Sequence, residues 1–117
     1  MKTKLKHVRV NVEDFNESLE WYTTTLGFKV AGTWPPEHPD YVHLKSEGGA
    51  TFAIMQDKNF PSPGRFNFDV DNVEELWEVL KERVNVVEEL FSTPWRSKKF
   101  TICDLSGNEL GFVQESK

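Results

Sequence analysis

Residues 7–15 read HVRVNVEDF, and residues 65–73, which lie 58 positions further along, read RFNFDVDNV. Both segments alternate apolar and polar residues over their first six positions, which predicts a β-strand with one buried face. The same offset places a glycine-containing turn and a second alternating segment, residues 47–56, over residues 105–114. A single register that holds over so much of the chain predicts an internal duplication of one structural unit.

A helix is expected directly after each of the two alternating segments. Asp14 and Asn72 are of the types that cap helix N-termini, and a glutamate, Glu17 or Glu75, follows each of them three positions later, as in a capping box. Apolar residues then recur at helical spacing: Phe15, Leu19, Tyr22 and Leu26 in the first segment, and Val73, Trp77 and Leu80 in the second. Each half of the chain therefore predicts a strand, a helix and then about three further strands.

The composition excludes several classes of protein. With 14 Lys and Arg against 19 Asp and Glu, the chain of 117 residues carries a formal net charge of −5, which argues against a surface that binds nucleic acid or anionic membranes. No apolar run approaches the roughly 20 residues that cross a bilayer, and the first residues lack the apolar core of a secretory signal. The single cysteine, Cys103, excludes an internal disulfide and fits a reducing compartment. We therefore expect a cytoplasmic protein with no nucleic-acid or membrane partner.

Both ends of the chain resemble a known protein family. Residues 7–14, with the helical stretch that ends in Leu-Gly-Phe at residues 26–28, resemble the opening module of the vicinal oxygen chelate superfamily, which contains glyoxalases, bleomycin resistance proteins and extradiol dioxygenases. Residues 93–96 (TPWR) and 104–110 (DLSGNEL) are similar to its C-terminal signature, in which an Asp-Pro-Asp-Gly-Asn turn precedes the last strand. This chain keeps the first aspartate, the glycine and the asparagine of that turn, with leucine and serine between them.

The resemblance implies a fold and an assembly. The fold is α+β: two βαβββ modules, about residues 5–58 and 63–115, form one domain over residues 1–117, with a curled, cup-shaped mixed sheet and the helices on its outer face. The polar residues of each strand would then line the cup, and the apolar residues would face the helices. Because the sheet has open edges, we expect a homodimer with its pockets near the subunit interface.

The metal site of the family is not matched by this sequence. The resemblance places the four metal ligands at His7, Ala53, Arg65 and Gly111. Only His7 has a donor atom suited to a cation, whereas a catalytic zinc site uses three protein ligands, and a guanidinium would add positive charge. We therefore expect no metal and no other cofactor. A displaced metal site built from His7, His43 and Glu109 remains an alternative.

Without a metal, the remaining precedent in the family is the bleomycin resistance type, which sequesters a small molecule. We therefore expect a metal-free small-molecule binding protein that holds its ligand in the sheet cup. The candidate ligand-binding residues are polar or aromatic: His7, Arg9, Asn11, Arg65, Asn67, Trp95, Trp34 and Thr101. The acidic chain suits a cationic ligand and the two arginines suit an anionic one, and the sequence does not decide between them.

Two further functions stay open at this point. The first is a glyoxalase-like lyase or isomerase, or a dioxygenase-related metalloenzyme, with a metal site elsewhere. The second is a metal-free enzyme in which Glu109 or His43 acts as a general base on a ligand fixed by Arg9 and Arg65. The two arginines have a structural alternative as well, because a carboxylate such as that of Glu109 or Asp69 would neutralise them.

Overall fold

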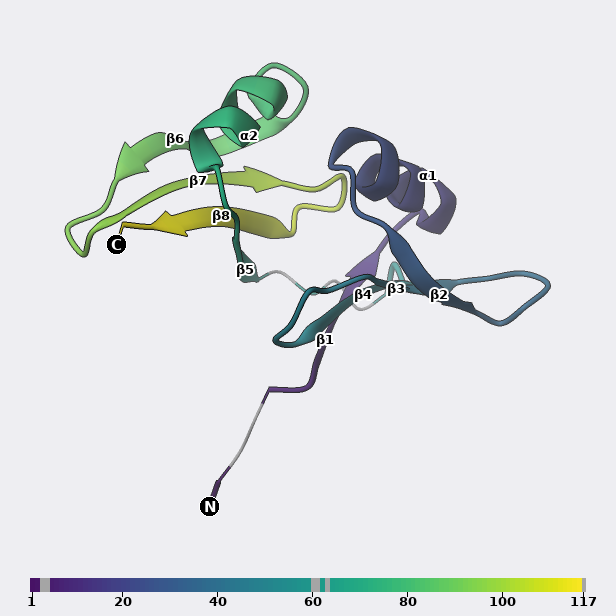
Figure 1. Cartoon of the computed structure of the whole chain (residues 1–117). Coiled ribbons are helices and arrows are strands. Elements are labelled where there is room, and N and C mark those ends of the chain that lie inside the picture. The colour runs from purple at the N-terminus through teal and green to yellow at the C-terminus, as the bar shows by residue number, and fades with distance from the viewer. Residues whose placement is uncertain (3–4, 60–61, 63, 117) are drawn as a thin grey trace. The chain divides into compact units, whose positions relative to one another are not determined.

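The computed structural model describes the whole chain except residues 3–4, 60–61, 63 and 117. It divides into two compact units, unit 1 (Met1–Ser62) and unit 2 (Pro63–Lys117), each with its own sheet and helix (Figure 1). Within the described residues, no helix is both long enough and apolar enough to cross a bilayer.

Unit 1 is a four-stranded mixed sheet with one helix. Its elements in chain order are β1 (His7–Val12), α1 (Phe15–Glu20), η1 (Trp21–Thr25), β2 (Val30–Trp34), β3 (Tyr41–Leu44) and β4 (Thr51–Gln56). The strand order across the sheet is β1-β4-β3-β2, with β1 parallel to β4 and the other pairs antiparallel.

Unit 2 repeats this arrangement. Its elements are β5 (Arg65–Asp69), α2 (Val73–Leu80), β6 (Asn85–Ser92), β7 (Ser97–Cys103) and β8 (Glu109–Glu115). The strand order is β5-β8-β7-β6, and again only the first pair is parallel. The prediction of an α+β fold built from two βαβββ modules is therefore confirmed.

The two units also share a common register of strand pairing. His7 pairs with Thr51 across β1 and β4, and Arg65 pairs with Glu109 across β5 and β8. The residue numbers of the second pair are each 58 higher than those of the first, which is the offset between the two sequence repeats. The duplication therefore extends from the amino-acid pattern to the hydrogen-bonding register of each sheet.

Each helix begins where the sequence predicts. The Asp14 carboxylate accepts a hydrogen bond from the Glu17 backbone amide at 3.0 Å, and the Asn72 side chain accepts one from Glu75 at 3.1 Å. These caps satisfy amide groups that the first helical turn leaves without a partner.

A second contact at each helix start joins the helix to the sheet. Gln56, the last residue of β4, accepts a hydrogen bond from the Phe15 amide through Oε1 at 2.6 Å. Gln114 of β8 accepts one from the Val73 amide in the same way at 2.9 Å. The two glutamines occupy equivalent places in the duplication, so this junction belongs to the common structural unit.

The first helix differs from the predicted continuous helix. Its α-helical part ends at Glu20, and residues Trp21–Thr25 form a wider π-helical turn. Within that turn, Tyr22 is fully buried, and its ring centroid lies 5.9 Å from that of Phe28 and 6.0 Å from that of Phe52. Single π-helical turns are uncommon and are not encoded by apolar periodicity, so the spacing of the apolar residues gave no sign of it.

One face of each sheet, covered by the helix of its unit, forms the hydrophobic core. In unit 1, α1 packs on β4, and in unit 2, α2 packs on β7 and β8 (Figure 1). The buried apolar residues of these cores include Val10, Val12, Val42, Phe52 and Ile54 in unit 1, and Val73, Leu80, Phe100, Ile102, Leu110 and Phe112 in unit 2. The alternate residues of each strand lie on the opposite sheet face, called the polar face below.

Candidate functional site

The polar face of unit 1 carries cationic, imidazole and aromatic groups. Its strand residues, taken from the pairing register, are His7, Arg9, Asn11, Gly32, Trp34, Tyr41, His43, Thr51, Ala53 and Met55. Three of the predicted ligand-binding residues, His7, Arg9 and Asn11, are contributed by β1 alone. No member of this set has a carboxylate.

Three rings lie next to one another on this face. His7 Nε2 and Tyr41 Oη are hydrogen-bonded at 2.9 Å, with ring centroids 6.3 Å apart and planes inclined by only 25°. The Tyr41 centroid lies 6.0 Å from that of His43. His43 lies against the β2 backbone, because a Cβ atom placed on Gly32 would come within 2.6 Å of its Cε1. Tyr41, which joins His7 and His43, was expected on this face but was not among the predicted ligand-binding residues.

Arg9 has a weak partner on the same face. Its Nη1 donates to the Met55 sulfur at 3.1 Å, and a thioether is a poor acceptor for a guanidinium. Among the described residues, no carboxylate lies within ion-pair distance of Arg9. The Arg9 side chain is exposed, so most of its N–H donors face solvent. Of the other β1 candidates, Asn11 donates its backbone amide to Ser62 Oγ at 2.6 Å.

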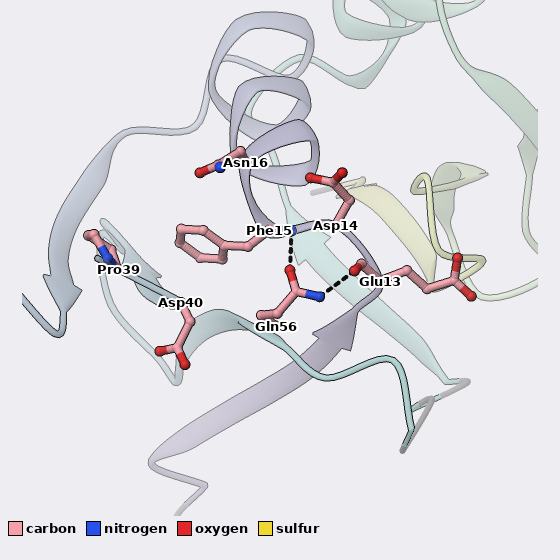
Figure 2. A pocket seen from close by; sticks show the side chains of 7 residues that line it. All are labelled: Glu13, Asp14, Phe15, Asn16, Pro39, Asp40 and Gln56. Atoms are coloured by element: carbon pink, nitrogen blue, oxygen red, sulfur yellow. Dashed lines mark hydrogen bonds between the residues drawn. The ribbon is translucent and has the colours of Figure 1, made fainter. Parts of the chain in front are cut away.

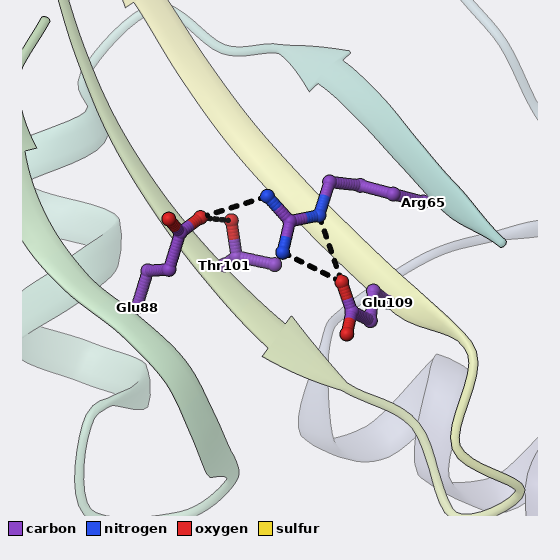
Figure 3. A network of polar contacts seen from close by, with 4 residues as sticks. All are labelled: Arg65, Glu88, Thr101 and Glu109. Carbon is purple, nitrogen blue, oxygen red and sulfur yellow. Dashed lines mark hydrogen bonds and ion pairs between the residues drawn. The ribbon is translucent and has the colours of Figure 1, made fainter.

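On the polar face of unit 2, by contrast, the arginine is neutralised by carboxylates (Figure 3). Arg65 Nε and Nη2 both lie 2.7 Å from Glu109 Oε1, and Nη1 lies 3.0 Å from Glu88 Oε1. The fully buried Thr101 donates its hydroxyl to the same Glu88 oxygen at 2.9 Å. The hydrogen bond that Arg65 donates to Glu109, with the charges of both glutamates, raises the pKa of Arg65 above its usual value despite some desolvation.

This network bears on the two hypotheses for Arg65, which are an anchor for a ligand and a member of a structural ion pair. The arginine forms a structural ion pair with Glu109, as the alternative reading stated, and a second one with Glu88. The side chains involved are 36–40% exposed, so each pair contributes only about 0.2–1 kcal/mol to stability. Glu109 Oε1 is occupied by the guanidinium, which does not favour Glu109 as a general base.

The position of Glu88 on the polar face was not predicted, because the pairing of β6 is irregular. Its pairing with β7 shifts register between Val86 and Glu88 and again between Glu88 and Phe91. Each shift changes which residues share a face, so counting alternate residues along NVVEELFS cannot assign Glu88 to the polar face. The available sign in the sequence was the adjacent acidic pair Glu88 and Glu89.

Asn67 fills the space above Gly111. A Cβ atom on Gly111 would lie 2.1 Å from Asn67 Oδ1 and 3.1 Å from the Lys99 Cε atom. Asn67 and Gly111 are direct partners across β5 and β8. The position at which the family resemblance implies a metal-binding carboxylate is therefore a glycine covered by a neighbouring amide.

The residues present do not fit the metal site that the family implies. Ala53 is fully buried and has no donor atom, Gly111 is covered by Asn67, and Arg65 holds an internal ion pair. In the part of the chain that the structure describes, no group of three or more His, Cys, Asp or Glu side chains is arranged to hold a metal ion. We therefore derive no chemistry through a metal.

Trp34 and Trp95 are the candidate residues with a large apolar side chain exposed to solvent. Trp34, at the end of β2, is 65% exposed, and Trp95 is 72% exposed. Trp95 lies at the tip of the turn between β6 and β7, which Thr93 and Ser97 close through their backbones at 2.8 Å and their hydroxyls at 2.6 Å. The turn presents the indole to solvent on a well-defined backbone.

The backbone of this turn is strained at Arg96, whose φ is +61°. A residue with a Cβ atom pays about 1–2 kcal/mol for this left-handed conformation, which glycine adopts freely. Replacing Arg96 with glycine should therefore raise the free energy of unfolding by about 0.5–1 kcal/mol, after the loss from the more flexible unfolded chain. Chemical denaturation measures the change. The Arg96→Ala variant should show no such gain, and equal stabilities of the two variants would contradict the explanation.

The turn before β8, which carries the family signature, has a structural role. Asp104, only 4% exposed, accepts hydrogen bonds through Oδ1 from the Ser106 and Asn108 amides at 2.9 and 2.8 Å. Its Oδ2 accepts one from Asn108 Nδ2 at 2.9 Å. Gly107 has a φ of +87°, which requires glycine in this tight turn.

A cavity opens beside the N-terminus of each helix. The first, of about 280 Å³, lies in unit 1 (Figure 2) and is lined by Glu13, Asp14, Phe15, Asn16, Pro39, Asp40 and Gln56. The second, of about 480 Å³, lies in unit 2 and is lined by Asp69, Val70, Asp71, Val113, Gln114 and Glu115. Neither cavity was predicted, because helix capping alone accounts for Asp14 in the sequence.

Comparison with known proteins identifies the family to which the chain belongs. The family model of the Glyoxalase/Bleomycin resistance protein/Dioxygenase superfamily matches residues 4–112. The chain therefore belongs to this superfamily, as its sequence resemblance indicated. No curated protein sequence matches the chain.

Several solved structures share the fold at low sequence identity. TioX from Micromonospora sp. ML1 has a TM-score of 0.82 at 16% identity, with 97% of this chain and 100% of TioX covered. TnmS3, an antibiotic binding protein from Streptomyces sp. CB03234, has a TM-score of 0.80 at 22% identity, with 98% of each chain covered. A superfamily member from Sphaerobacter thermophilus DSM 20745 has a TM-score of 0.78 at 21% identity, covering 97% and 98%. At these identities the similarity concerns the fold.

Proposed function

We propose that this protein binds a small molecule without a metal and holds it against the polar face of a sheet. The observation that carries the proposal is the loss of the family's metal-binding side chains. Alanine and glycine stand at two of the four places, and the guanidinium at the third is paired with Glu109 at 2.7 Å. Metal-dependent lyase or oxygenase chemistry needs a Lewis acid, and three of the four places offer no ligand for one.

The residues left on the polar faces suit binding. Small-molecule sites combine aromatic surface with a few polar groups that orient the ligand, and the ring cluster of His7, Tyr41 and His43 beside Arg9 has this composition. The structural neighbour TnmS3, described as an antibiotic binding protein, gives a precedent within the fold. Trp34, at the end of β2, supplies further exposed aromatic surface on unit 1.

The proposal includes the assembly. The two modules act as one domain in the cytoplasm, as the single cysteine suggests, and two copies of the chain form a homodimer. The edge strands β2 and β6, one from each sheet, expose apolar side chains, with Val30 at 45%, Val87 at 42% and Phe91 at 40%, and a second copy would cover them. Light scattering after size exclusion should give twice the 13.6 kDa of the chain. A monomer at micromolar concentration would contradict this part.

Metal loading tests the central claim. The purified protein is incubated with Ni²⁺, Zn²⁺ or Mn²⁺ in turn and dialysed, and its metal content is measured by elemental analysis. We expect far less than one metal ion per chain and no turnover of the methylglyoxal–glutathione hemithioacetal by any of the preparations. One tightly held ion per chain, or turnover that follows the metal content, would contradict the proposal and favour a glyoxalase-like or dioxygenase-related metalloenzyme. Native mass spectrometry of fresh material would also reveal a co-purifying organic ligand.

A further inference from the structure

The two polar faces have the same strand register but opposite electrostatic character. On unit 2, the Arg65 guanidinium is neutralised by Glu88 and Glu109 at 3.0 and 2.7 Å. On unit 1, the strand residues of the polar face include Arg9, His7 and His43 and no carboxylate. The duplication thus leaves one face with internal counter-charges and the other without them.

This contrast bears on the charge of the ligand. The net charge of −5 alone suggests a cationic ligand, but charges more than about 8 Å away are largely screened at physiological ionic strength. The local groups therefore decide, and Arg9 is the one arginine on a described polar face with only the Met55 thioether as its partner.

The groups beside Arg9 add a shape requirement. The His7 and Tyr41 rings are inclined by only 25° and are joined by a hydrogen bond of 2.9 Å, with His43 continuing the row. Rings with this arrangement present a broad unsaturated surface, against which a planar aromatic group packs in offset or tilted geometry. A guanidinium donates two parallel hydrogen bonds to a carboxylate.

We propose that the polar face of unit 1 takes an aromatic carboxylate, with Arg9 binding the carboxylate and the row of His7, Tyr41 and His43 contacting the aromatic part. This inference rests on the proposed function and names the chemical class of its ligand. Arg65 takes no direct part, because its donors are already used by two glutamates.

Three probes of matched size and different charge test the ligand class. These are 2-naphthoate, 2-naphthamide and 2-naphthylmethylammonium, titrated into the full chain by calorimetry and by amide chemical shifts. We expect 2-naphthoate to bind about tenfold tighter than the other two, which corresponds to about 1.4 kcal/mol. The shift changes should concentrate in β1, β3 and β4, and the binding should weaken as salt is added.

Three Arg-to-Gln variants test the anchor. Arg9→Gln should weaken 2-naphthoate binding about tenfold, to the level of the uncharged amide. Arg65→Gln should change it less than about twofold, as should Arg83→Gln, an exposed control that removes the same charge away from the polar faces. Amide spectra of each variant establish that it is folded.

The remaining outcomes separate this inference from the proposed function. If the amide or the cation binds as tightly as 2-naphthoate, or if Arg65→Gln weakens binding as much as Arg9→Gln, the ligand class or its anchor is wrong while small-molecule binding stands. If none of the three probes binds, the aromatic-carboxylate inference is wrong. If no co-purifying ligand is found either, the proposed function fails with it.

Discussion

Replacing Asp104 with alanine is expected to lower the free energy of unfolding by about 3 kcal/mol, because it removes the acceptor of three hydrogen bonds, two of them buried. The two backbone amides and the Asn108 side-chain amide that donate to this carboxylate lie at 2.8–2.9 Å. Asp104 and Asn108 are only 4% and 2% exposed, so water replaces the lost acceptor poorly. Urea denaturation followed by tryptophan fluorescence measures the loss.

A matched control shows whether the effect belongs to the turn. Asp71 is exposed, and Asp71→Ala should change the stability by less than about 0.5 kcal/mol. Asp104→Asn should fall between the two, because its single carbonyl oxygen replaces only part of the carboxylate. A cost for Asp104→Ala no larger than that for Asp71→Ala would mean that the signature turn is not held by this side chain.

Replacing Phe100 with alanine is expected to cost about 3–5 kcal/mol, the range for truncating a buried aromatic residue. Phe100 is fully buried in unit 2, with its ring centroid 5.2 Å from that of Trp77 and 5.3 Å from that of Phe112. Because these rings join α2 to β7 and β8, the cavity opens at the packing surface between helix and sheet. Thermal and urea unfolding measure the effect.

The control here is an exposed apolar residue of the same helix. Val79 of α2 is 50% exposed, and Val79→Ala should cost clearly less, within about 1 kcal/mol of the unmodified protein. Phe100→Leu should recover part of the loss by filling the cavity. Similar costs for the two alanine variants would show that the helix of unit 2 contributes little to its stability.

The fold was predictable because its information is local and repeated. The alternating segments at residues 7–12 and 65–70 and the caps Asp14 and Asn72 are patterns of a few residues, and each occurs twice at one offset. The glutamines Gln56 and Gln114 were aligned by the same offset, yet their contacts with the helix starts depend on where the last strand ends in space. Sequence spacing does not contain that information.

The site was predictable only in part, for physical reasons visible in individual residues. His7, Arg9 and Arg65 were assigned to the polar faces correctly, because β1 and β5 are regular. Whether each arginine has a counter-charge depends on Glu88, whose face is set by irregular pairing in β6. The two cavities depend on loops such as the one that carries Pro39 and Asp40, for which no sequence rule exists.

The ion pairs of Arg65 affect how the protein behaves in ordinary buffers. Because the Arg65 guanidinium is already paired with Glu88 and Glu109, sulfate and phosphate from the buffer should bind only weakly at the sheet of unit 2. Arg9 has the Met55 thioether and no carboxylate as its partner among the described residues. Small anions from the buffer should therefore bind at Arg9 and compete with any negatively charged compound under study. Assays and crystallisation trials are therefore best carried out in chloride at low concentration.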